Sequence, residues 1–372
     1  MKSLSTRRLL HGTFVLLSSS ALAACGAVIP DDFLSFEDCC EGLPPPPPDP
    51  DPSTQPATIL AATAPGVGSN TDRVQWSQEL DNEEVVGDQP FRLVQYASEY
   101  NTGIPALIGP SAPTNNSGAS LIVNIPADPD GEATFALSID NGVYPDPIAL
   151  TPSETGPFLE ATLDDGSQVR VFLDSSDQST AGAGGELQWT AYGNWSVTNA
   201  TMGNPTVGAR ADFVTGAETP DGNMPTTGTA TFDGFVLGTV ALGDGPNLKV
   251  ASLRGDATMT ADFANGTISG SAPTIIAIPL GQLPLPDGPI TPGASQPWNG
   301  LSFVGSFTQG LNGFTGNTNI TTAPNNSYSL SDAAAGLFSG MFYGPSANEL
   351  GAVWNLYDST GVASGVLVGK QP

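Results

Sequence analysis

The sequence contains almost no histidine. Its one histidine, His11, lies in an N-terminal segment that we expect to be removed from the mature protein. A mature chain without histidine cannot use a Ser-His-Asp triad, a Cys-His pair, a histidine proton shuttle or a histidine-bound metal. GxSxG, GxGxxG and Walker A motifs are also absent from the sequence. The sequence therefore predicts no catalytic residue, no metal site and no cofactor.

Positive charge is scarce as well. The chain has 10 Lys and Arg residues against 37 Asp and Glu residues. Three of the basic residues, Lys2, Arg7 and Arg8, lie in the N-terminal segment, so the mature chain keeps seven and has a formal net charge of −30. Nucleic-acid binding needs clustered Lys and Arg. We therefore expect no nucleic-acid partner, and a protein partner that presents basic or apolar surface.

The N-terminus is organised like a lipoprotein signal peptide. After the basic residues, an apolar stretch from Leu9 to Ala24 is too short to span a bilayer. It ends in Leu22-Ala23-Ala24-Cys25, which resembles the lipobox of bacterial lipoproteins. The resemblance implies cleavage of residues 1–24 and acylation of Cys25. Because Gly26 rather than Asp follows, it also implies placement in the outer membrane. The alternative is an ordinary secretory signal that is cut elsewhere.

Residues 25–72 predict a disordered, acidic stalk. From Leu43 the chain continues PPPPPDPDPSTQP, and proline at this density favours extended polyproline II. Cys39 and Cys40 are neighbours, and a disulfide between adjacent residues departs far from ordinary disulfide geometry. They are either a mobile pair in the tether or a pair with a crosslinking or redox role, and the sequence does not choose between these.

The rest of the chain predicts an all-β fold, because its apolar runs are short and alternate with polar residues. Leu187–Thr198 and Ala251–Phe263 each place apolar residues on one face, and Arg254 and Asp256 lie on the other face of the second run. Such a polar outer face does not suit contact with lipid. Asn265-Gly266 predicts a two-residue hairpin turn that sets Phe263 opposite Ile268.

Glycines recur inside the predicted strands, which favours a closed barrel over a sandwich. Four segments then follow in order: ELQWTAYGNWSV from Glu186, MPTTGTATFDG from Met224, ADFANGTISG from Ala261 and FYGPSANELG from Phe342. This series resembles the β-barrel domain of transferrin-binding protein B and of related surface lipoproteins, including factor H-binding protein. The resemblance covers about residues 185–370 and implies an eight-stranded antiparallel barrel.

The expected organisation is a signal peptide (1–24), the stalk (25–72), a smaller β-rich region (73–180) and the barrel (181–372). The resemblance implies that the β-rich region is handle-like, since each lobe of transferrin-binding protein B pairs an N-terminal handle sheet with a barrel. In the handle-like region strands are predicted over Arg92–Tyr96, Ser120–Ile125, Glu132–Asp140 and Gln168–Leu173. Asp164-Asp165-Gly166 predicts a hairpin turn. Asp128-Pro129-Asp130-Gly131 resembles a fragment of a calcium loop, but the further ligands of an EF-hand are missing, so we interpret it as a turn.

The insert between the last apolar runs, Gly344–Glu349, is interpreted as a corner of the barrel. Gly344 can adopt a positive φ and Pro345 fixes the next φ. Glu349 has no partner close in sequence, so we expect it to form structural hydrogen bonds and not to act as a functional carboxylate. Gly193-Asn194-Trp195 is similar to the GxW of lipocalins, but Trp195 is more simply a core residue.

Three classes of function remain open. The first is a lipid-anchored, surface-exposed outer-membrane lipoprotein that binds a protein or an iron or nutrient carrier without catalysis. The second is a lipocalin-like carrier that holds a small apolar ligand or haem inside the barrel. The third is a carboxylate-only enzyme such as a glycosidase, which needs two acids at a defined separation. The anchor, the stalk and the resemblance favour the first class, the binding lipoprotein. Its expected contact surface is formed by loops such as Leu280–Pro297. Large inward side chains would count against the second.

Overall fold

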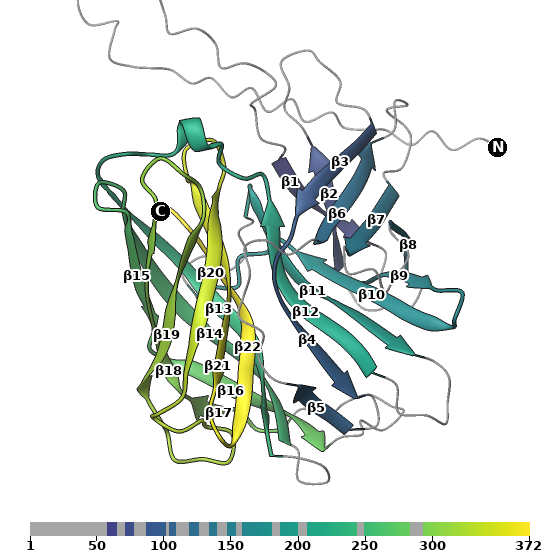
Figure 1. Ribbon diagram of the computed structural model, residues 1–372, viewed down its shortest axis with the longest axis vertical. Helices are drawn as coiled ribbons and strands as arrows, with labels where there is room; N and C mark the ends of the chain where they lie inside the picture. Colours follow the sequence, from purple (N-terminus) through teal and green to yellow (C-terminus); the bar gives the residue numbers. More distant parts are fainter. Residues whose placement is uncertain are drawn as a thin grey trace, which may run out of the picture. The chain divides into compact units, whose positions relative to one another are not determined.

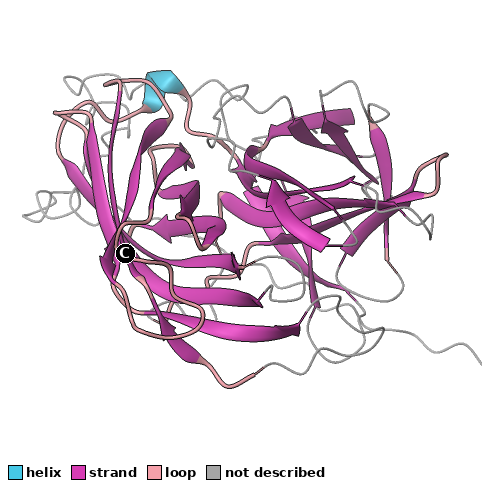
Figure 2. Ribbon diagram, turned by 60° about the horizontal axis from the view of Figure 1, so that its bottom comes forward, coloured by secondary structure: helices cyan, strands magenta, loops and turns pink. Residues whose placement is uncertain are grey.

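The computed structural model describes residues 58–64, 71–77, 87–101, 104–108, 119–125, 134–139, 147–153, 158–180, 187–199, 207–243, 249–282 and 293–372. These residues form β-strands and their connections, with one short 3-10 turn, η2 (Asp221–Asn223) (Figure 1, Figure 2). The all-β prediction is confirmed. Within the described residues no helix has the length and hydrophobicity required to cross a membrane.

The first large sheet has ten strands. In spatial order they are β3 (Gly87–Arg92), β6 (Ala119–Ile125), β7 (Thr134–Ile139), β8 (Ile148–Pro152), β9 (Phe158–Thr162), β10 (Ser167–Asp174), β11 (Thr190–Asn199), β12 (Val207–Gly216), β4 (Val94–Asn101) and β5 (Ile104–Ile108). Only Leu93 separates β3 from β4, and these two strands pair with β6 and β12, near opposite ends of the sheet. The sheet therefore nearly closes on itself, and we refer to it as the N-terminal sheet.

The N-terminal sheet encloses a hydrophobic core of its own. Trp195 is buried there, and its indole N–H donates a 2.7 Å hydrogen bond to the Gln95 side chain. The main buried partners are aliphatic residues from β6, β7, β8 and β10: Leu121, Val123, Leu137, Ile148, Leu150, Val169 and Val171. Trp195 is thus a core residue, as its sequence context predicted. The strands predicted over Ser120–Ile125, Glu132–Asp140 and Gln168–Leu173 are present within a residue or two. The strand predicted over Arg92–Tyr96 instead spans the break at Leu93 between β3 and β4, and β4 continues to Asn101.

The change from the first sheet to the barrel comes later than expected. The sequence placed residues 181–372 in the barrel, yet β11 pairs with β10 and β12 pairs with β4, so both lie in the N-terminal sheet. The change of sheet falls between Gly216 and Thr229. The physical reason is that alternation in Leu187–Thr198 identifies a buried face but not the sheet that buries it. At the start of β11 the opposite face is buried too, because Tyr192 packs against the barrel.

The second sheet is a closed antiparallel barrel. Its strands are β13 (Thr229–Leu242), β14 (Lys249–Asp262), β15 (Thr267–Ala272), β16 (Ile275–Gln282), β17 (Gln296–Trp298), β18 (Gly300–Phe307), β19 (Phe314–Thr322), β20 (Ala335–Tyr343), β21 (Glu349–Tyr357) and β22 (Gly361–Lys370). β13 pairs with both β14 and β22, which closes the ring. Eight strand positions complete the ring, because β16 continues β15 along the same edge of β14 and β17 continues β18. The predicted eight-stranded barrel is confirmed.

Glycines inside the barrel strands make room for aromatic rings. Gly238 on β13 lies opposite Gly365 on β22, and Trp354 lies opposite Gly365 on the other side. A Cβ on Gly238 would come within 2.8 Å of the Trp354 ring. The same arrangement places the Phe338 ring against Gly305 and Gly316, which are also opposite each other. These glycines therefore allow rings to lie flat on the inner wall.

The hairpin after β14 differs from its sequence prediction. Ile268 lies opposite Ala261, so the loop spans four residues, Phe263–Gly266, and not two. The Asp262 carboxylate accepts the backbone N–H groups of Ala264 and Asn265, and this cap stabilises the wider loop. A shift of two residues keeps each side chain on its face. Phe263 and Ile268 are accordingly both buried, as the pattern indicated.

Part of the expected stalk is a strand. β1 (Thr58–Ala64) pairs with β2 (Thr71–Ser77) in a two-stranded sheet, although residues 25–72 were expected to be disordered. The reason lies in the composition, because the proline run ends at Pro56 and TILAATA contains no proline. The signal peptide, Cys25, Cys39, Cys40 and Asp128–Gly131 lie outside the described residues.

Candidate functional site

The interior of the barrel is filled by aromatic side chains. Phe342 on β20 is the centre of this cluster, and its ring centroid lies 5.1–5.9 Å from those of Phe232, Phe263, Phe307 and Phe314. Rings at such distances and inclined angles interact favourably as well as filling space. A second pair, Trp298 and Trp354, packs with centroids 6.2 Å apart. Because these large side chains fill the interior, they argue against a carrier that holds a ligand inside the barrel.

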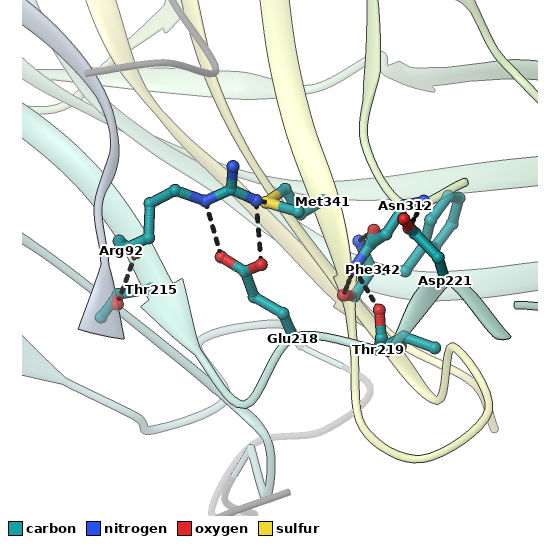
Figure 3. Close-up of polar contacts among 8 residues, drawn as sticks. All are labelled: Arg92, Thr215, Glu218, Thr219, Asp221, Asn312, Met341 and Phe342. Carbon is teal, nitrogen blue, oxygen red and sulfur yellow. Dashed lines mark hydrogen bonds and ion pairs between the residues drawn. The ribbon is translucent and has the colours of Figure 1, made fainter. Parts of the chain in front are cut away.

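Each end of the barrel is closed by a connection. At one end the segment that contains η2 is fixed by Asn312, whose side-chain amide donates to the backbone oxygens of Thr219 and Phe342. Asn312 also accepts the N–H of Phe342 (Figure 3). At the other end the β19–β20 connection lies against β17, where Asn299 exchanges two hydrogen bonds with the backbone of Leu330.

The barrel and the N-terminal sheet share a hydrophobic contact, which we call the joint. It buries Val94, Leu187, Tyr192 and Val214 from the sheet side against Phe235, Met341, Tyr343, Val353, Val366 and Val368 from β13, β20, β21 and β22. Tyr192 and Phe235 meet edge to face, with ring centroids 5.3 Å apart. Burial of this apolar surface stabilises the sheet and the barrel as one body.

An arginine and a glutamate close one side of the joint. Arg92, the last residue of β3, donates from Nε and Nη2 to the two carboxylate oxygens of Glu218, at 2.9 Å each (Figure 3). This paired geometry is the strongest form of ion pair between these groups. Burial alone would lower the pKa of Arg92, but the adjacent Glu218 carboxylate raises it. Because both side chains remain partly exposed, we expect the pair to orient the joint more than to stabilise it.

Glu349 belongs to the joint and forms structural hydrogen bonds, as its position in the sequence predicted. It is buried, and its two carboxylate oxygens accept the backbone N–H groups of Gln188 and Trp189, at 2.7 and 3.0 Å. Burial raises the pKa of Glu349 above its ordinary value, although these N–H groups act in the opposite direction. The corner before it is also confirmed, because Gly344 has a φ of 85° and the insert connects β20 to β21.

A second ion pair crosses the joint near the C-terminus. The ammonium of Lys370, at the end of β22, lies 2.9 Å from the Asp177 carboxylate. Asp177 is almost fully buried and also accepts the Ser179 N–H. Burial alone would raise the pKa of Asp177, but Lys370 and Ser179 hold it below its ordinary value. Nearby, Arg254 on β14 donates to the backbone oxygen of Gln178.

The basic residues explain what the sequence could and could not show about the joint. Arg92, Arg254 and Lys370 are three of only seven basic residues in the expected mature chain, and all three link the N-terminal sheet to the barrel. Their partners lie far away in sequence, so no motif spacing identified them. The rarity of basic residues was the one available signal, because a positive charge in an acidic chain is expected to pair with an acidic or carbonyl group.

The residues predicted to act in anchoring or binding are not brought together by the described structure. Cys25 lies outside it, as do residues 283–292 of the predicted contact loop Leu280–Pro297. The flanks of that loop lie at the ends of β16 and β17. Within the described residues, no group of three or more His, Cys, Asp or Glu side chains is placed to hold a metal ion.

Comparison with solved structures gives several relatives of low identity. A variant of transferrin-binding protein B from Haemophilus parasuis Hp5 is 17% identical over 81% of this chain and 48% of its own, with a TM-score of 0.38. Transferrin-binding protein B from Neisseria meningitidis is 16% identical over 68% and 52%, with a TM-score of 0.33. The N-lobe of lactoferrin-binding protein B from Moraxella bovis is 16% identical over 54% and 79%, with a TM-score of 0.31.

This chain spans about half the length of the Haemophilus structure. No curated protein matches it. Residues 224–371 match the family model described as the C-lobe and N-lobe β-barrels of Tf-binding protein B. The match begins just before β13 and ends with β22, so it covers the closed barrel and leaves out the N-terminal sheet. The closed barrel of this chain is therefore similar to the β-barrels of Tf-binding protein B.

Proposed function

We propose that this chain is a lipid-anchored lipoprotein of the outer-membrane surface that binds a protein partner without catalysis. The observation that carries the proposal is a barrel that is similar to the β-barrels of Tf-binding protein B and whose interior is filled by aromatic rings. A filled interior leaves the loops and the outer surface for recognition. It is also the reason to prefer a binding module over a carrier with a ligand inside.

The anchor rests on Leu22-Ala23-Ala24-Cys25. Two acyl chains on Cys25 are sufficient for stable attachment to a membrane, whereas one chain is not. We expect the Cys25→Ser variant to lose incorporation of a fatty-acid analogue and to leave the membrane fraction. Cys39→Ser is the matched control and should keep both label and membrane attachment. Persistent labelling of the Cys25→Ser variant would refute the assignment.

The partner should be a protein with basic or apolar contact surface, because the mature chain has a formal net charge of −30. The family description makes an iron carrier of the transferrin type the first one to test. Steering by opposite charge accelerates association and weakens as salt rises. We therefore expect the association rate to fall as the salt concentration is raised from about 0.05 to 0.5 M.

The test uses the mature chain with Cys25→Ser, and transferrin and lactoferrin as immobilised probes. Alanine at Leu283 and Leu285, in the predicted contact loop, should weaken binding more than about fivefold if these residues contribute as contact hot spots. Leu311→Ala is the control, because Leu311 is exposed but lies outside that loop. Absence of binding to both probes would exclude the iron-carrier class. Turnover of a glycoside substrate by the mature chain would overturn the non-catalytic assignment.

A further inference from the structure

The outward side chains of the barrel form straight rows across several strands. The middle row is Thr260, Ser269, Val304, Asn317 and Leu337, on β14, β15, β18, β19 and β20. Its neighbours are Asp262, Thr267, Ser306, Thr315 and Ser339 on one side, and Thr258, Ser271, Ser302, Asn319, Ala335 and Tyr357 on the other. The wall, as used below, consists of Thr267, Ser269, Ser271, Ser302, Val304, Ser306, Thr315, Asn317, Asn319, Ala335, Leu337 and Tyr357.

The wall carries no charged side chain, although the chain as a whole has a formal net charge of −27. Between Asp262 and Asp332 the sequence has one charged residue, Asp287, and it lies in the connection between β16 and β17. Strands β15, β18 and β19 are therefore free of charge along their whole length. The joint buries residues on another part of the barrel, centred on β21 and β22, and every wall residue except the half-buried Ser302 is exposed.

Large apolar side chains are exposed on the same wall. Among the described residues five large hydrophobic side chains are exposed, and three of them, Val304 (57%), Leu337 (39%) and Tyr357 (51%), belong to the wall. Val304 and Leu337 lie on either side of Asn317, and Tyr357 lies opposite Ala335. The wall thus combines apolar positions and one aromatic ring with neutral hydroxyl and amide groups.

We propose that this wall binds an uncharged oligosaccharide. Ser and Thr hydroxyls and Asn amides both donate and accept hydrogen bonds, and so do the hydroxyl groups of a sugar. Val304, Leu337 and the Tyr357 ring supply apolar surface for the C–H faces of the sugar, and Tyr357 can stack on a ring from one side. The ligand should be uncharged, because the wall has no charged side chain that could pair with an ionic ligand.

A protein partner, or a second copy of this chain, fits the wall less well. The wall consists of twelve residues. A stable protein interface takes about 20–30 residues from each partner. Serine is also depleted at protein interfaces, whereas it supplies four of the wall residues. The small, hydroxylated face is of a size and chemistry that suit a short stretch of saccharide bound weakly.

The test is affinity electrophoresis of the mature Cys25→Ser chain in gels that contain dextran, mannan or galactan, each a neutral polysaccharide. We expect retardation by at least one of them, insensitive to salt. Asn317→Asp and Tyr357→Ala should each weaken it by roughly two- to tenfold, the loss of one hydrogen bond or one stacking contact. Asn325→Asp and Leu311→Ala are matched controls, because both residues are exposed and lie outside the wall.

Several outcomes would overturn the proposal. They are absence of retardation in all three gels, equal weakening by the control variants, and retention only on a sulfated dextran that salt abolishes. If the wall variants lose capture of transferrin or lactoferrin while saccharide retardation persists, the wall is a protein contact instead. The inference does not depend on the proposed protein partner, since the salt response separates the two activities.

Discussion

Replacing Phe342 with alanine should lower the free energy of unfolding by about 3–5 kcal/mol. The Phe342 ring is fully buried and contacts four other phenylalanine rings, from β13, the β14–β15 loop, β18 and β19. The substitution loses the free energy gained by transferring the ring out of water. It also leaves a cavity that the surrounding close-packed residues cannot fill. The measurement is equilibrium unfolding in urea of the mature Cys25→Ser chain.

Two controls make the Phe342 result specific. Phe342→Leu keeps an apolar side chain of smaller volume and should cost less than alanine, because a smaller cavity remains. Val304→Ala, on the exposed face of β18, should change stability by less than about 0.5 kcal/mol. A loss below about 1 kcal/mol for Phe342→Ala would mean that the interior is not close-packed. It would reopen the possibility of a ligand inside the barrel.

The barrel could be predicted from sequence because its signals are local. The alternation in Ala251–Phe263 and the strand glycines each constrain a few neighbouring residues, and the structure agrees with them. The register of the β14–β15 hairpin was missed by two residues, because the Asp262 side chain, and not the turn dipeptide alone, determines the loop length. In the strand and in the hairpin alike, the alternation showed which residues face the core. The buried residues were therefore identified even though the strand pairing in the hairpin differed.

The assignment of strands to sheets could not be predicted in the same way. β11 carries the pattern of a half-buried strand, and that pattern is the same whichever sheet it joins. Only its pairing with β10 and β12 places Trp195 in the N-terminal sheet. The joint could not be predicted from the sequence either, because its ion pairs connect residues separated by 126 positions or more, such as Arg92 and Glu218. For Glu349 the absence of any local partner was itself informative.

Replacing Lys370 with methionine should lower the free energy of unfolding by about 2–3 kcal/mol. The change keeps most of the apolar length of the side chain but leaves the Asp177 carboxylate buried without its cation. Breaking a fully buried ion pair typically costs 3–5 kcal/mol. We expect somewhat less here, because Lys370 is about one-third exposed while Asp177 is only 2% exposed.

A double variant separates the uncompensated charge from lost packing. Adding Asp177→Asn to Lys370→Met removes the buried charge and keeps an oxygen that accepts the Ser179 N–H. If charge is the cause, the double variant should be more stable than Lys370→Met alone, and this coupling is measured by a double-mutant cycle. Glu160→Gln, whose partner Arg170 is half exposed, serves as the control and should cost less than about 1 kcal/mol.

The pH dependence of Lys370→Met supplies an independent test of the same ion pair. In the wild type the pKa of Asp177 is lowered, so its contribution to stability is present above the unfolded pKa of about 3.9 and is lost as pH falls through the lower folded value. Without Lys370, burial should raise the pKa of Asp177 above its unfolded value, and the sign reverses. Stability of the variant should then rise as pH falls from 7 towards 4, so its deficit relative to the wild type shrinks over that range. A deficit that stays constant between pH 7 and pH 4, with no recovery in the double variant, would show that Lys370 acts through packing alone.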